Sequence, residues 1–115
     1  MVAETIEELA KKECVPCKGG TPALKGPELT DMHRKLGKDW GLIDDHHIEK
    51  TFKFPDFKSA LAFTNRVGEI AEEQNHHPDI LLTYGKARVT IFTHTIDGLT
   101  ESDFVLAAKV EKAYA

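Results

Sequence analysis

The 115-residue sequence contains only two cysteines and one tryptophan, and it lacks any long apolar run. Two cysteines cannot form the multiple disulfides of a small secreted scaffold. No stretch approaches the roughly 20 apolar residues that span a bilayer, so we expect no membrane partner. The first segment, MVAETIEELAKKE, carries early acids and no continuous apolar core. It does not resemble a secretory signal, and we therefore expect a cytoplasmic location.

The sequence also lacks an excess of positive charge. Its formal net charge is -4 and its pI is about 5.8. Direct binding of nucleic acid is therefore not expected, because the phosphate backbone favours a basic surface. The chain is 41% hydrophobic and 30% charged, which is typical of an ordinary globular protein, and its length suggests one domain.

Hydrophobic periodicity predicts helices and hairpins in alternation. Apolar residues at helical spacing and Pro27 at a first helical position predict a helix over 27–36. Alternating residues predict a hairpin around an Asp-Asp turn. Asp56 suits an N-cap and Asn75 a left-handed end for a long helix. The predicted elements of this first part are strands over 40–43 and 47–54 and a helix over 57–74.

The second half predicts another hairpin and a closing helix. Strands over 79–84 and 87–94 flank a Gly85-Lys86 turn, and Thr100 with Asp103 forms a capping-box signature before a helix over 101–113. We expect residues 1–26 to form an irregular arm with a short helix, and residues 27–115 to form the domain. The predicted class is α+β, with the order α-β-β-α-β-β-α. We expect a four-stranded antiparallel sheet with helices on one face.

Two clusters have adequate structural explanations. Cys14 and Cys17 make half of a zinc knuckle, but no second pair follows, and their Pro/Gly-rich surroundings do not suit a redox motif. An arm with reduced thiols is the preferred interpretation. His46 and His47 beside two aspartates fit a solvated turn.

His76 and His77 are harder to explain, because they stand where the long helix ends and the second hairpin begins. With a turn at 85–86, His94 falls roughly opposite His77, so three imidazoles are expected to converge. Proton transfer near neutral pH, metal binding and a structural or pH-sensing role all remain open. Adjacent histidines point to opposite sides of an extended segment, which is awkward for a metal. Covalent catalysis is not indicated, because no Ser or Cys nucleophile lies near the cluster.

The spaced set Glu72, His76-His77-Pro78, Tyr84, His94 and Asp103 resembles the pterin-4a-carbinolamine dehydratase family. The similarity extends over roughly Leu29 to Lys112 and includes FKFPDFKSALAF and THTIDGLTESD. It implies the same fold, dimers or dimers of dimers, and no metal or cofactor. The implied reaction is dehydration of 4a-hydroxytetrahydropterin to quinonoid dihydropterin, which recycles the cofactor of aromatic amino acid hydroxylases.

The same resemblance implies the site residues. The implied catalytic residues are His76, His77 and His94. Substrate binding is expected from Glu72, Asn75, Thr93 and Thr95, although Asn75 and Thr95 replace acids found in other members. Glu72 is expected to orient His76 one helical turn away.

Structural roles are preferred for two further residues of the motif. Tyr84 is expected to pack at the hairpin end, and Asp103 to cap the last helix. Two alternative functions remain. One is a protein-binding regulatory module, since animal members also serve as dimerisation cofactors of a homeodomain transcription factor. The other is a histidine-based metal-binding protein.

Overall fold

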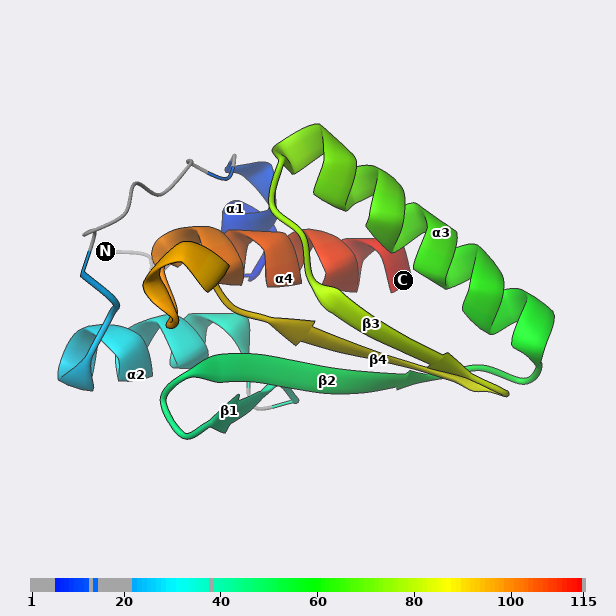
Figure 1. The fold of residues 1–115 in the computed structure, drawn as a ribbon, viewed down its shortest axis with the longest axis horizontal. Helices are drawn as coiled ribbons and strands as arrows, with labels where there is room; N and C mark the ends of the chain where they lie inside the picture. Colours follow the sequence, from blue (N-terminus) through cyan, green and yellow to red (C-terminus); the bar gives the residue numbers. More distant parts are fainter. Residues whose placement is uncertain (1–5, 13, 15–21, 38, 115) are drawn as a thin grey trace.

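The computed structural model describes residues 6–12, 14, 22–37 and 39–114, and it confirms the α+β class (Figure 1). No helix in these ranges is long and apolar enough to cross a bilayer. A short 3-10 helix, η1, was not predicted. The elements in chain order are α1 (Ile6–Lys11), α2 (Gly26–Leu36), β1 (Gly41–Ile43), β2 (His47–Lys53), α3 (Phe57–Gln74), β3 (Asp79–Thr83), β4 (Lys86–Ile91), η1 (His94–Ile96) and α4 (Glu101–Tyr114).

The four strands form one antiparallel sheet in the order β1-β2-β4-β3, and the helices cover one of its faces (Figure 1). Successive side chains of a strand point to opposite faces, so every second residue faces the helices. These inward residues are buried and form the sheet side of the core: Ile48, Phe52, Ala87, Val89 and Ile91.

Helix α4 is the centre of the helical layer, because it contacts α1, α2, α3 and β4. Its residues 102–108 are all buried, which is unusual for a helix of a small domain and explains its weak amphipathic pattern. Ala107 and Ala108 are completely buried and let neighbouring elements approach closely. Leu9 of α1 is also fully buried and belongs to the same core as Trp40 and Phe104.

The predicted position of the second hairpin turn is wrong by one residue. Thr83 pairs with Lys86, so the two turn residues are Tyr84 and Gly85 rather than Gly85 and Lys86. Gly85 has a φ of 71°, a left-handed conformation that glycine adopts at low cost. Tyr84 is 73% exposed, so it does not pack at the hairpin end as expected.

Helix α3 begins and ends where the sequence predicted. The Asp56 side chain accepts a hydrogen bond of 2.7 Å from the backbone N–H of Ser59, and Asn75 ends the helix with a φ of 52°. The backbone hydrogen bond from Ser59 lowers the pKa of Asp56 below its ordinary value. The ionised carboxylate therefore stabilises the start of α3.

Replacing Asp56 by alanine should lower the melting temperature by about 4 °C at neutral pH, because one N-terminal N–H of α3 loses its acceptor. Since the folded-state pKa is lowered, this stabilisation is present above the ordinary aspartate pKa and disappears as the pH falls through the folded value. Thermal unfolding followed by circular dichroism between pH 2 and 7 tests this (about five pH steps suffice to define the trend).

Asp56→Asn is the matched control, because its amide oxygen still accepts from Ser59 but does not titrate in this range. If the difference in melting temperature between wild type and Asp56→Ala stayed constant down to the lowest pH, the proposed origin of the stabilisation would be contradicted.

Candidate active site

His76 and His77 leave the end of α3 through a left-handed turn. The Asn75 N–H bonds to the carbonyls of Ala71 and Glu72, and the His76 N–H bonds to Ala71 O at 3.1 Å. The bonds from Asn75 N–H to Glu72 O and from His76 N–H to Ala71 O together form a Schellman motif, and Pro78 prevents the helix from continuing. After this turn, both imidazoles border one pocket together with residues 92–95.

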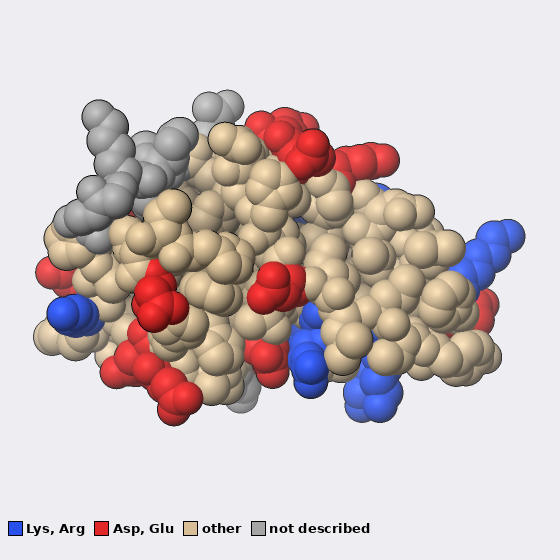
Figure 2. All heavy atoms as spheres, viewed as in Figure 1, with Lys and Arg blue, Asp and Glu red and all other residues tan. Residues whose placement is uncertain are grey.

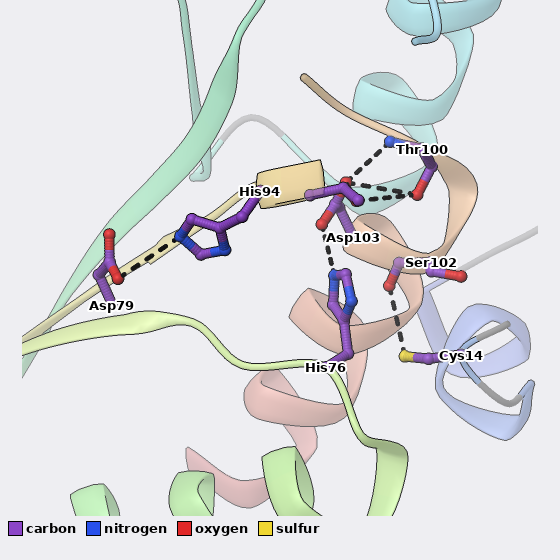
Figure 3. Close-up of polar contacts among 8 residues, drawn as sticks. Cys14, His76, Asp79, His94, Thr100, Ser102 and Asp103 are labelled. Atoms are coloured by element: carbon purple, nitrogen blue, oxygen red, sulfur yellow. Dashed lines mark hydrogen bonds and ion pairs between the residues drawn. The ribbon is translucent and has the colours of Figure 1, made fainter. Parts of the chain in front are cut away.

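His76 is held by a fully buried carboxylate. Its Nε2 lies 2.6 Å from Asp103 Oδ1 in the first turn of α4 (Figure 3). The other carboxylate oxygen, Oδ2, accepts from Thr93 Oγ1 at 2.7 Å and from the backbone N–H of Thr100 at 2.8 Å. The bond to Thr100 confirms the predicted capping interaction. Asp103 therefore caps α4 and also binds His76.

His77 has a different partner, which corrects the predicted role of Glu72. His77 Nε2 lies 2.5 Å from Glu72 Oε2, whereas His76 contacts Asp103. The helical spacing that would place Glu72 beside His76 no longer applies once Asn75 takes a left-handed conformation. Glu72 therefore orients His77, and both side chains are largely exposed.

His94 comes from the other side of the site, just after β4. The observed register, continued past the pair Asp79–Thr90, puts Phe92 rather than His94 opposite His77. The predicted facing of His77 and His94 is therefore wrong, and His94 instead begins η1. Its Nε2 lies 4.0 Å from Asp79 Oδ1 (Figure 3), and its ring centroid lies 4.2 Å from that of Phe92.

The three histidines nevertheless line one pocket of about 260 Å³. This volume suits a small ring system and lies slightly below the usual range for ligand pockets, which is about 300–1,000 Å³. Six of the seven predicted site residues border it, and Glu72 reaches it only through His77. The pocket residues are Asn75, His76, His77, Phe92, Thr93, His94 and Thr95.

Each of the three imidazoles has its own carboxylate, and the three pairs differ in burial. The side chain of His76 is 14% exposed, whereas those of His77 and His94 are 53% and 58% exposed. A carboxylate only accepts hydrogen bonds, so the nitrogen facing it carries the hydrogen. In His76 and His77 this nitrogen is Nε2, which leaves Nδ1 as the nitrogen that can accept or release another proton.

Cys14 lies near the site but does not border the pocket. Cys14 donates its backbone N–H to Gln74 Oε1 at 2.8 Å, and its Sγ lies 3.5 Å from Ser102 O (Figure 3). Cys17 lies outside the described residues. Within the ranges that the structure covers, no group of three His, Cys, Asp or Glu side chains is arranged to hold a metal ion.

Sequence reasoning missed Phe92 and the tie between Asp103 and His76. Phe92 could have been identified from the sequence as a pocket residue, because it precedes His94 by two positions and alternate residues of a strand share a face. The contact between Asp103 and His76 joins residues 27 positions apart, for which no local spacing rule exists. The turn histidine His46 was also underestimated: its ring lies 4.6 Å from that of Phe92.

Comparison with known proteins gives concordant results. The family described as pterin 4 alpha carbinolamine dehydratase matches residues 22–113. A relative from Rubrobacter xylanophilus is 61% identical over 107 residues, covering 93% of this chain and 99% of its own. One from Alkaliphilus metalliredigens is 52% identical over 107 residues, covering 93% and 96%. Both carry the provisional name pterin-4-alpha-carbinolamine dehydratase.

Solved structures show the same fold. A crystal structure from Brucella melitensis, entitled transcriptional coactivator/pterin dehydratase, is 32% identical with a TM-score of 0.75 and covers 82% of this chain and 100% of that one. A pterin dehydratase-like protein, described as a RuBisCO assembly factor in the alpha-carboxysome, is 22% identical with a TM-score of 0.59. It covers 70% of this chain and 94% of its own, and it shows likeness of fold alone. From the extent of the family match and the identity of the relatives, we conclude that the chain belongs to the pterin-4a-carbinolamine dehydratase family.

Proposed function

We propose that this protein dehydrates 4a-hydroxytetrahydropterin to quinonoid dihydropterin, with His76, His77 and His94 as the proton-transferring groups. The observation that carries the proposal is the convergence of three imidazoles, each beside a carboxylate, on one small pocket. Family membership supports the pterin as substrate.

The reaction needs two proton transfers and no external oxidant or reductant. The C4a–O bond breaks as the departing hydroxyl takes a proton, and the N5–H proton is lost as the C4a=N5 double bond forms. One water molecule leaves in total. Imidazole is suited to both transfers, because its unperturbed pKa lies close to neutral pH. At least one histidine acts as the acid and another as the base.

The polar groups between the histidines are proposed to bind the pterin ring. Asn75 offers an amide and Thr95 a hydroxyl at the pocket wall, and Phe92 offers an aromatic face. The Thr93 hydroxyl bonds to Asp103, so its contribution is to hold the pocket wall as well as to face the substrate. Glu72 contributes by orienting His77. A homodimer or homotetramer and a cytoplasmic location stay predictions from the sequence.

Alanine at His76 or at His94 should lower the rate of dehydration by about 100-fold or more, because a positioned general acid or base is lost. The measurement uses chemically generated 4a-carbinolamine and follows quinonoid dihydropterin by absorbance above the spontaneous rate. His33→Gln is the control, since His33, on α2, bonds to the backbone carbonyl of Trp40 and does not border the pocket. Near wild-type rates in both the His76 and His94 variants would exclude the assignment.

Asparagine at Asp103 should lower both stability and turnover. The amide has one acceptor where the carboxylate has two, so either His76 or the Thr93–Thr100 pair loses its acceptor in a buried place. We expect a loss of about 1–3 kcal/mol in the free energy of unfolding, measured in urea. Nitrogen-15 shifts of the His76 ring should report loss of the fixed Nε2–H form, and the rate of dehydration should fall about tenfold.

Glu101→Gln is the matched control for this variant, because it neutralises a carboxylate in the same helical turn. Glu101 is exposed and forms a surface ion pair with Lys12 at 3.8 Å, so the control should change the free energy of unfolding by less than about 0.5 kcal/mol. If Asp103→Asn were as stable and as active as this control, the buried carboxylate would not organise the site.

A further inference from the structure

The turn between β1 and β2 lies directly beside the His94 side of the pocket. Ile43 pairs with His47, so Asp44, Asp45 and His46 form the turn, and both aspartates have a left-handed φ. The His46 N–H donates to Ile43 O at 2.9 Å and closes the turn. Figure 2 shows carboxylate side chains gathered over this turn and the adjoining part of the surface. His46 therefore stands among carboxylates, close to the segment that carries His94.

His46 contacts two points of that segment. Its Nε2 lies 2.6 Å from Asp97 Oδ1, and its ring centroid lies 4.6 Å from that of Phe92. Asp97 ends η1 in a left-handed conformation, with its N–H directed to His94 O at 3.3 Å. His46 thus contacts the residues just before and just after the stretch 93–96, which includes His94.

The tautomers required by these contacts are mutually consistent. Because the Asp97 carboxylate only accepts, His46 Nε2 carries a hydrogen, and in the neutral ring Nδ1 is then an acceptor. His47 Nδ1 lies 3.1 Å from His46 Nδ1 and supplies the matching donor. The two neighbouring histidines therefore form one hydrogen-bonded chain that ends on Asp97.

The Phe92 ring connects His46 to His94. It contacts His46 at a centroid distance of 4.6 Å and His94 at 4.2 Å, and it borders the pocket. His46 itself does not border that pocket; it lines the neighbouring hollow together with Asp97. Its effect on the chemistry must therefore pass through Phe92 and Asp97.

The anchoring of segment 92–98 explains why the contacts of His46 with Phe92 and Asp97 are needed. Thr93 is fixed twice, by its backbone bridge to Gly98 and by its hydroxyl bond to Asp103. Residues 94–97 lie between Thr93 and Gly98 and include His94. The Nε2 atom of His94 lies 4.0 Å from Asp79 Oδ1. The short bond from His46 to Asp97 and the tilted ring contact of His46 with Phe92 add two further contacts to this segment.

We propose that His46 is a positioning residue that fixes the place of the His94 imidazole at the pocket. This inference rests on the proposed function for its effect on catalysis, but the placement of His94 can be measured independently. Misplacement of a reacting group by about 1 Å can cost up to about 100-fold in rate, and an exposed anchor costs less than that.

The kinetic test compares His46→Ala, His46→Gln and Asp97→Gly. We expect kcat to fall about 3- to 10-fold in His46→Ala and in Asp97→Gly, because each removes the same contact. The double variant should be no worse than the more affected single variant. His46→Gln should recover at least half of the lost activity, because its amide can donate to Asp97 from nearly the same place.

Asp45→Gly is the matched control for Asp97→Gly. Both aspartates have a left-handed φ, of 53° and 51°, and both substitutions remove one carboxylate from the same region. Glycine relieves the backbone equally in both cases. The control should keep wild-type kcat, so any loss specific to Asp97→Gly is due to the bond with His46.

The independent readout is the NMR signal of the His94 ring, assigned by its disappearance in His94→Gln. The ring lies close to Phe92, so its proton shifts are sensitive to their mutual position. They should move in His46→Ala and Asp97→Gly, and they should stay in place in Asp45→Gly. Melting temperatures within a few degrees of wild type would separate a local displacement from unfolding.

The outcomes separate the two proposals. An inactive wild-type protein with shifted His94 signals in the variants rejects the proposed function and supports the positioning role. Unshifted His94 signals in both His46→Ala and Asp97→Gly overturn the positioning role, whatever the activity. With an active wild type, unchanged kcat in both variants, or failure of His46→Gln to restore activity, also overturns it.

Discussion

The buried carboxylate of Asp103 is the interaction on which both the fold and the pocket depend. It joins the start of α4, the end of β4 and the turn after α3, through Thr100, Thr93 and His76. A buried charge is costly unless hydrogen bonds replace its lost hydration, and here donors satisfy both oxygens. Two of the groups that stabilise the charge, His76 and Thr93, also border the pocket. Stability and site geometry are therefore coupled at this residue.

The three histidine–carboxylate pairs form a series from the interior to the surface. The His76 pair is the most buried, and a low dielectric strengthens its hydrogen bond, whereas the pairs of His77 and His94 are screened by water. His76 is consequently the most fixed in orientation and tautomer. The side chains of His77 and His94 are more than half exposed and are therefore freer to change orientation. The site thus combines one rigid imidazole with two accessible ones.

The sequence predicted those features that depend on local rules. The ends of α3 follow from the cap at Asp56 and the left-handed Asn75, and the alternating strands identify the sheet. The errors arose where a single residue changes geometry. Gly85 takes the second turn position instead of the first, which displaces the expected partner of His77, and Asn75 breaks the spacing between Glu72 and His76. The contact between His76 and Asp103 depends on tertiary packing, for which the sequence carries no spacing signal.

The side of the pocket with His76 and the side with His94 are anchored differently. This difference determines where substitutions can alter the pocket without affecting folding. The wall with His76 is tied to the core through Asp103, so a substitution there affects folding as well as chemistry. The wall with His94 is held by Phe92 and by exposed contacts of Asp97 and Asp79, which contribute little to global stability. Substitutions near the β1–β2 turn can therefore shift the position of His94 while leaving the core intact. Adjustment of the pocket to a particular substrate is physically easiest on that side.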